Sequence, residues 1–216
     1  MNEQAFFLHI SFHFNSLSPF FPQRMSRAKI AFFGDPHVGQ TFLIHRINGV
    51  DLSYTCYEPT DCDDTFSATI DANGKQYLLE MYHSWKLDEY SALRDQFVRT
   101  CHAFGIIYSI TSRVSFEHVS EYISFISRER GDKNVPTILV GNKCDLEEER
   151  QVPTEEAMEF SKSHGMQFFE VSAKTYNNVD LLIKSLVELC ESSLSLKNNT
   201  NPESSSRKEG DRCFIQ

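Results

Sequence analysis

Hydrophobic positions follow two alternating patterns between residues 29 and 189. Apolar runs or period-two alternation, both typical of strands, occur in six segments: 29–33, 65–70, 77–82, 103–110, 137–140 and 167–171. Helical spacing or helix start signals occur in five segments: 41–47, 88–100, 115–130, 153–165 and 179–189. The turn sequence Asp71-Ala-Asn-Gly74 predicts that the second and third strands form a hairpin. Strands that alternate with helices predict an α/β fold, in which a mostly parallel sheet is covered on both faces.

Two of the expected helices carry further local signals. In the helix expected at 115–130, Val119, Ile123 and Ile126 share one face, which predicts that this face packs on the sheet. Gly165 follows the last periodic residues of the helix expected at 153–165, and a glycine there is typical of a helix C-terminal cap.

The two ends of the chain differ from this body. Residues 1–24 hold six of the 18 Phe residues: Phe6, Phe7, Phe12, Phe14, Phe20 and Phe21. Glu3, His9 and His13 interrupt this apolar stretch, which disfavours a secretory signal peptide. An unstructured extension and a native start at Met25 both remain open. Residues 192–216 are rich in Ser, Asn, Lys and Glu, which predicts a disordered tail after a globular domain at 25–191.

Composition narrows the class of protein. A chain of 216 residues with 40% hydrophobic residues suits one domain with a single core. The formal net charge of −9 disfavours broad nucleic-acid binding, so no nucleic-acid partner is expected. The six cysteines form no CxxC pair, which argues against a disulfide framework or a zinc site. The sequence contains no apolar run long enough for a transmembrane helix.

Two short segments predict recognition of a guanine base. Asn142-Lys143-Cys144-Asp145 follows the strand expected at 137–140, at the strand end where ligands bind in α/β folds. The Asp145 carboxylate can accept two hydrogen bonds from the N1–H and N2–H edge of guanine, whereas adenine would leave it desolvated and unpaired. Ser172-Ala173-Lys174 follows the next strand, and its backbone N–H groups can meet the guanine O6. Two such loops in this order favour guanine binding over an ordinary helix cap.

Residues 34–41 approximate the phosphate-binding pattern GxxxxGK[ST] between a strand and a helix. Gln40 stands where that pattern has Lys, and a neutral amide cannot neutralise a phosphate charge. The loss of one charge-assisted contact costs about 1.5–3 kcal/mol. Pro36 also removes one N–H donor from the loop. The expected phosphate contacts are Gly34, Asp35, Pro36, His37, Val38, Gly39, Gln40, Thr41 and Phe42, with the Thr41 hydroxyl on Mg²⁺.

On these motifs the chain resembles the Ras family of small GTP-binding proteins, from residue 29 to about residue 190 and again in its last four residues. Tyr57-Glu58-Pro59-Thr60 is similar to the first switch of that family, and residues 89–96 are similar to the second. The resemblance implies a P-loop NTPase-type small G domain, with a six-stranded sheet and five helices. It also implies a monomer that binds GTP, GDP and Mg²⁺, with nucleotide contacts from Tyr57 and Thr60 and a second metal contact from the Thr60 hydroxyl.

The family likewise implies the protein partners. A downstream effector would bind the segment from Tyr57 to Thr65, and an exchange factor or a GTPase-activating protein would act on the switch. The family's aromatic residue beside guanine has no clear counterpart here, and Leu52 and Tyr54 are the candidates.

The second switch departs from the family pattern Asp-Thr-Ala-Gly-Gln. His83 replaces the Asp that orients the Mg²⁺ hydration shell, and Leu87 replaces the Gln that orients the attacking water. Lys86 replaces the Gly that meets the γ-phosphate. Two interpretations of Lys86 remain: a solvated residue, or an ammonium that replaces the charge missing at Gln40. These changes predict impaired GTP hydrolysis and a weakened Mg²⁺ site.

The last four residues, Cys213-Phe214-Ile215-Gln216, match the C-a-a-X pattern, and Gln in the last place favours farnesylation of Cys213. The charges of residues 203–212 sum to zero, so no polybasic patch supports the lipid. One lipid chain gives reversible binding. The expected location is therefore the cytoplasmic face of the plasma membrane or another membrane, together with a cytosolic pool.

The sequence therefore favours a guanine-nucleotide switch with impaired hydrolysis. The competing interpretation is a pseudo-GTPase, a scaffold or decoy that keeps the fold and the lipid anchor without switching. A third interpretation is an active GTPase whose catalytic groups come from a partner protein.

Overall fold

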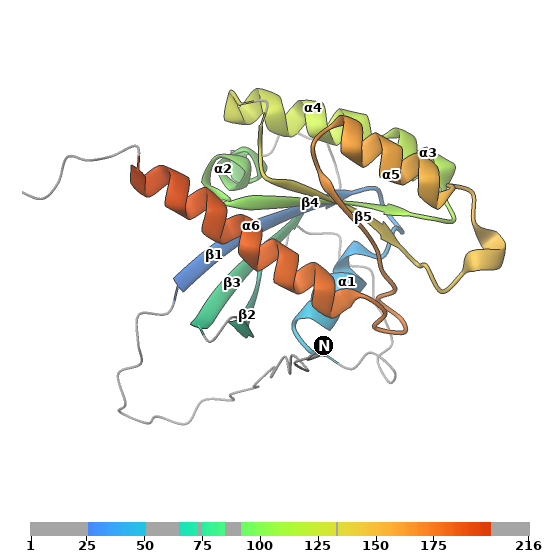
Figure 1. Cartoon of the computed structure of the whole chain (residues 1–216), viewed down its shortest axis with the longest axis horizontal. Coiled ribbons are helices and arrows are strands. Elements are labelled where there is room, and N and C mark those ends of the chain that lie inside the picture. Colours follow the sequence, from blue (N-terminus) through green and yellow to red (C-terminus); the bar gives the residue numbers. More distant parts are fainter. Residues whose placement is uncertain (1–25, 51–64, 73–74, 85–91, 133, 200–216) are drawn as a thin grey trace, which may run out of the picture.

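The computed structural model describes residues 26–50, 65–72, 75–84, 92–132 and 134–199 (Figure 1). The strands are β1 (Ser26–Gly34), β2 (Thr65–Ala72), β3 (Lys75–Ser84), β4 (Ala103–Ser109), β5 (Thr137–Asn142) and β6 (Gln167–Glu170). The helices are α1 (Gln40–Ile47), α2 (Ala92–Thr100), α3 (Arg113–Glu117), α4 (Val119–Arg130), the 3-10 turn η2 (Glu147–Glu149), α5 (Thr154–Ser163) and α6 (Val179–Asn199).

The strands form one six-stranded sheet in the order β2-β3-β1-β4-β5-β6. Only β2 runs antiparallel, and its pairing of Ala72 with Lys75 confirms the predicted hairpin. The remaining neighbours pair in parallel, so the carboxyl ends of β1, β4, β5 and β6 lie along one edge of the sheet. The fold class expected from the sequence is confirmed. Ligands of such sheets bind outside this edge, beyond the carboxyl ends of the strands.

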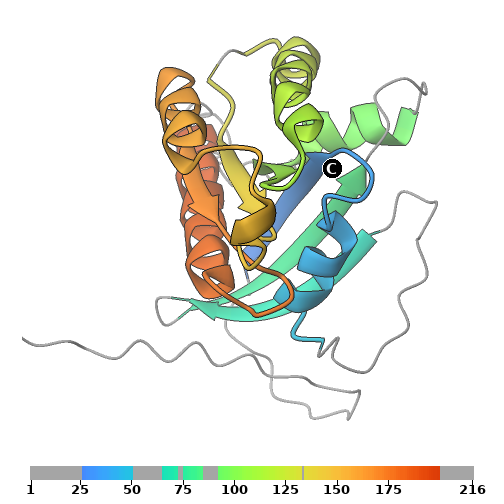
Figure 2. The same ribbon diagram turned by 90° about the vertical axis from the view of Figure 1, so that its right-hand side faces the viewer.

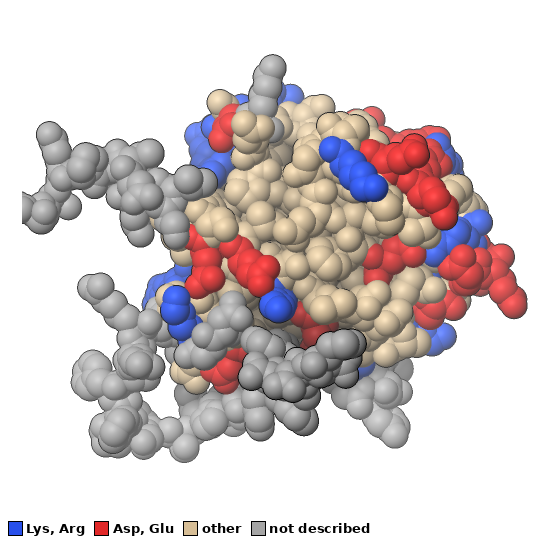
Figure 3. Space-filling model, in the orientation of Figure 1, with Lys and Arg blue, Asp and Glu red and all other residues tan. Residues whose placement is uncertain are grey.

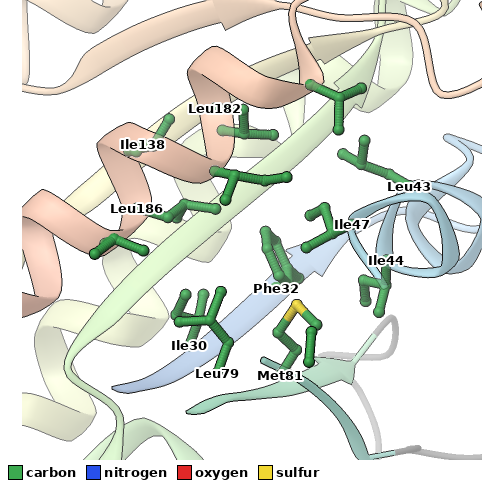
Figure 4. Close-up of a cluster of buried hydrophobic side chains, with 14 of the residues drawn as sticks. Ile30, Phe32, Leu43, Ile44, Ile47, Leu79, Met81, Ile138, Leu182 and Leu186 are labelled. Atoms are coloured by element: carbon green, nitrogen blue, oxygen red, sulfur yellow. The ribbon is translucent and has the colours of Figure 1, made fainter. Parts of the chain in front are cut away.

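Each face of the sheet carries its own hydrophobic core. Along β1 the side chains alternate: Ile30 and Phe32 enter the core beneath α1 and α6, and Ala31 and Phe33 enter the core beneath α2, α4 and α5. Figure 4 shows the first core, where Phe32 lies among side chains from α1, α6 and β3. Figure 2 shows the helices on both sides of the sheet. Because both faces are covered, the central strands consist of nearly continuous apolar residues.

The helix predicted at 115–130 differs in two details. It begins at Arg113, where the Ser112 hydroxyl caps it by accepting a hydrogen bond from the Ser115 N–H at 3.3 Å. His118 separates its first turn, α3, from α4. The expected face is confirmed: Val119 and Ile126 are buried, and the half-buried Ile123 packs against the same core. The bulky Tyr122 and Phe125 are buried as well, because the apolar stripe is turned toward β1 and β4.

The expected start of the tail at residue 192 is corrected, because α6 continues to Asn199. Within its C-terminal half, α6 contacts the β2–β3 hairpin through Glu191. The Glu191 carboxylate accepts a hydrogen bond from the Tyr77 hydroxyl and lies 3.5 Å from Lys75 Nζ. Burial and the hydrogen bond to Glu191 raise the pKa of Tyr77 to about 12, so this hydroxyl stays a donor. Residues 200–216 lie outside the described part of the chain.

Three other predictions concern segments that the structure describes fully, partly or not at all. Gly165 follows α5 with a φ of +66°, and its N–H donates to the Lys162 carbonyl, so it ends the helix as predicted. The helix expected at 88–100 is described from Ala92, and residues 88–91 lie outside the described part. Residues 1–24 lie outside it too.

None of the described helices is both long and apolar enough to cross a bilayer.

Acidic side chains gather at the end of the molecule that carries η2 (Figure 3). Arg150 neutralises part of this charge: its guanidinium binds Glu147 at 2.7 Å and Glu170 at 2.7 Å. The pair with Glu170 joins the end of η2 to β6, beside the sheet edge where the site residues lie. This arrangement fixes the segment that follows Asp145.

Candidate functional site

The loop between β1 and α1 contains two positions that require glycine. A side chain at Gly34 would collide with the Ile107 carbonyl oxygen of β4. Gly39 has a φ of +86°, and a Cβ there would lie 2.5 Å from Asn142 Nδ2. Both glycines of the predicted phosphate motif are therefore explained by the close approach of this loop to its neighbours.

Gly39, the residue that caps α1, has no side chain that could accept a hydrogen bond from the first turn of the helix. Such a helix start favours an anion, because the N–H groups and the helix dipole supply positive partial charge. Thr41 is buried in this turn, and Phe42 packs against the core beneath α1. Pro36 and His37 are exposed at the tip of the loop, and Val38 is buried below it.

Gln40 occupies the lysine position of the motif and is almost fully buried. Its Nε2 donates a hydrogen bond to the Phe32 carbonyl oxygen of β1 at 2.7 Å. One amide N–H of the two then remains to reach an anion, and it carries no formal charge. The structure thus gives this loop a neutral donor where the motif has a cation.

Asn142 joins three loops at the sheet edge. Its Nδ2 donates to the Val38 carbonyl at 2.8 Å, and its Oδ1 accepts from the Ala173 N–H at 3.2 Å. Lys143 adds a second bond to the phosphate loop, from its Nζ to the His37 carbonyl at 2.7 Å. Hydrogen bonds therefore join the predicted phosphate loop directly to both predicted base loops.

The Asp145 side chain is held by the second base loop. The Ser172 hydroxyl donates to Asp145 Oδ1 at 2.6 Å and accepts from the Thr175 N–H at 3.0 Å. One carboxylate oxygen is thus fixed by the protein, and Asp145 itself is exposed. Lys174 is exposed as well. A fixed, exposed carboxylate is suited to accept hydrogen bonds from a planar donor edge such as that of guanine.

Asp35 makes contacts that the sequence did not predict. Its Oδ2 lies 2.7 Å from His118 Nδ1, and its Oδ1 accepts a hydrogen bond from the Tyr122 hydroxyl at 3.0 Å. The hydrogen bond to Asp35 raises the pKa of His118, although partial burial acts in the opposite direction. No local pattern signals this pairing, because the partners are 83 and 87 positions apart.

His83 lies at the end of β3, where the Ras family has an aspartate. It is 2% exposed, and its ring stacks on Phe66 with centroids 5.9 Å apart and planes at 23°. Among the described residues, no cluster of three or more His, Cys, Asp or Glu side chains could hold a metal ion. A stacked imidazole supplies no negative charge to a metal hydration shell.

The remaining predicted site residues lie outside the described part of the chain. They are Tyr57, Thr60, Lys86, Leu87 and Cys213, together with the candidates Leu52 and Tyr54 and the effector segment up to residue 64. The structure therefore describes the phosphate loop and both base loops.

Comparison with known proteins agrees with this geometry. The model of the Ras family matches residues 29–192. The chain is 34% identical to the Ras-like protein rasX of Dictyostelium discoideum over 171 residues, which cover 79% of each protein. It is 34% identical to the human Ras-related protein R-Ras over 157 residues, 73% of this chain and 72% of that protein. It is 33% identical to Dictyostelium discoideum rasW over 160 residues, 74% of this chain and 73% of that protein.

The substitution Asn142→Ala removes the bonds that join the three loops. Because it leaves a backbone carbonyl and an N–H without their partner, we expect the free energy of unfolding to fall by about 1–3 kcal/mol. Urea unfolding followed by circular dichroism measures this change. Asn134→Ala, at an exposed asparagine, is the matched control and should stay within about 0.5 kcal/mol of wild type. Equal effects of the two substitutions would show that Asn142 does not hold the loops together.

Proposed function

This chain belongs to the Ras family of small GTPases, and we propose that it acts as a membrane-associated guanine-nucleotide switch whose own GTP hydrolysis is impaired. The observation that carries this proposal is the pair of hydrogen bonds that joins the Asn142 side chain to Val38 and Ala173. It assembles the two base loops and the phosphate loop into one surface at the sheet edge. Ras family proteins bind GTP or GDP with Mg²⁺ and act with effectors, exchange factors and GTPase-activating proteins.

The polar residues expected on the guanine side of the site are held in place by hydrogen bonds. Asp145 presents a carboxylate held by Ser172, and Lys143 lies across the phosphate loop. These contacts support selection of guanine over adenine, because an adenine edge would leave the carboxylate unpaired. The segment from Tyr57 to Thr65 is the proposed effector-binding surface, on the strength of its resemblance to the first switch.

The phosphate side is weaker. Gln40 binds the Phe32 carbonyl and brings no charge, and Pro36 lacks an N–H. Thr41, at the start of α1, and Thr60 would hold Mg²⁺, which would neutralise phosphate charge when bound. His83 supplies no carboxylate for the metal's hydration shell. We therefore propose that Mg²⁺ binds more weakly than in family members with an intact motif.

Binding of fluorescent GDP to the full chain tests the proposal. We expect GTP to displace the labelled GDP and ATP to fail, in the presence of Mg²⁺. Asp145→Ala should weaken GDP binding by about 100-fold or more, because it removes two hydrogen bonds to a charged acceptor. The matched control is Asp132→Ala, at an exposed aspartate of the loop after α4, and it should bind as wild type does. Displacement by ATP as readily as by GTP would contradict guanine selection.

The pseudo-GTPase remains the second candidate, and Gln40 and His83 favour it. In that case the chain would keep the fold and its lipid anchor and act as a scaffold or decoy. A wild-type chain that fails to bind GDP or GTP at millimolar concentration would select this candidate.

Single-turnover hydrolysis of bound GTP tests the proposed impairment. Intrinsic hydrolysis by an intact Ras protein proceeds at roughly 3–5 × 10⁻⁴ s⁻¹. We expect a slower rate here, because Leu87 cannot orient the attacking water. Lys86→Gly/Leu87→Gln should raise the rate, and Leu181→Gln, at an exposed leucine of α6, should leave it unchanged. A wild-type rate at or above the intact value would contradict the impairment.

Farnesylation of Cys213 is the proposed basis of membrane association. In eukaryotic cells we expect intact mass to show the farnesyl group on wild type and its absence on Cys213→Ser. Fractionation should then find wild type in both the membrane and the cytosolic fractions, because one lipid gives reversible binding. Exclusive membrane residence of wild type would contradict the reversible anchor.

A further inference from the structure

The phosphate loop has an unusual charge. Residues 34–41 contain no Lys or Arg, and their one charged side chain is the Asp35 carboxylate. A carboxylate in a loop that holds nucleotide phosphates repels them, and the repulsion is strong where water is partly excluded. A loop of this composition needs a positive charge from another part of the chain if it is to bind a polyphosphate.

The structure brings Asp35 to the helical segment that lies beside the loop (Figure 2). His118 Nδ1 lies 2.7 Å from one carboxylate oxygen, and the Tyr122 hydroxyl donates to the other at 3.0 Å. His118 and Tyr122 are four positions apart, one helical turn, and so share a face. Both oxygens of Asp35 are therefore engaged on the α4 side of the loop.

This contact is firmly anchored. Tyr122 is 3% exposed, and its ring lies against Phe33, with centroids 6.1 Å apart. Phe33 is the residue of β1 that precedes Gly34, where the loop begins. Strand, loop and helix are thus packed as one unit, and Asp35 is not free to turn toward a bound phosphate without breaking two hydrogen bonds.

We propose that His118 and Tyr122 are positioning residues for the phosphate loop, which hold the Asp35 carboxylate away from bound phosphates while the protonated His118 cancels its charge. This inference rests on the proposed nucleotide binding and deepens it. A histidine from a different element thereby offsets the negative charge of Asp35 in a loop that has lost its own lysine.

The charges around His118 set the sign of the pH dependence. Asp35 acts on it from the loop, and Glu121 and Glu117 act on it from its own helical segment; all three favour the protonated ring. The pKa of His118 is therefore raised above its ordinary 6.5. The benefit to nucleotide binding is fully present below about pH 6.5 and is lost as pH rises through the raised pKa.

The test measures affinity for labelled GDP from about pH 5.5 to about pH 8.5, a span that covers the titration of histidine. Wild-type affinity should fall by about tenfold across the titration, and Asp35→Asn should remove that fall. The titration of GDP itself is common to both proteins and cancels in their ratio. His118→Gln should weaken binding by about tenfold at low pH, but not in the Asp35→Asn background.

Further variants separate charge from hydrogen bonding. Tyr122→Phe removes one hydrogen bond to the Asp35 carboxylate but no charged group, so it should lower nucleotide affinity only a few-fold and keep the pH profile. His164→Gln, at an exposed histidine after α5, should bind as wild type does at every pH. An NMR titration of the His118 ring should give a raised pKa in wild type and an ordinary pKa in Asp35→Asn, with no nucleotide added.

Three outcomes are distinguishable. Nucleotide binding with a pH profile that is identical in wild type and Asp35→Asn overturns this inference and leaves the proposed function standing. An equal loss from His118→Gln in both backgrounds also overturns it, because the loss would then be structural. No binding by any variant overturns the proposed function and the inference together.

Discussion

The buried amide of Asn142 is the constraint on which the site depends. It is 2% exposed, and it must satisfy a donor and an acceptor without water. It does so by binding the Val38 carbonyl of one loop and the Ala173 N–H of another. Because a buried amide without partners costs free energy, the three loops are stable only when they lie together. The same packing requires glycine at position 39, because a Cβ there would clash with the Asn142 side-chain amide.

Around this centre the chain has the polar side chains that we expect to recognise a base, and it has neutral side chains at two positions where the family motifs carry charge. Asp145, Lys143 and Ser172 are in place and hydrogen-bonded. Gln40 and His83 instead make contacts with the protein interior, one with a backbone carbonyl and the other with an aromatic ring. This combination of side chains is the basis of our proposal that the chain binds guanine nucleotide and hydrolyses GTP slowly. The pair of Asp35 and His118 shows how such a loop tolerates its own negative charge.

Sequence patterns predicted the strands, the hairpin and the parallel order of the sheet, because these follow from local periodicity and from the order of the elements. They did not predict the contact of α6 with the β2–β3 hairpin, which joins Glu191 to Tyr77, 114 positions apart. The same limit explains Asp35 and His118: neither residue belongs to a motif that names the other. Asn142 was predicted as a base contact, and its bond to Val38 became visible only when loops 104 positions apart were placed side by side.

Hydrogen exchange of the full chain, with and without GDP and Mg²⁺, tests the central claim that three loops form one guanine-nucleotide site. The account predicts that GDP slows exchange together in residues 34–41, 142–146 and 172–175, and that ADP does not. Slowed exchange in one loop alone, or equal effects of GDP and ADP, would contradict it.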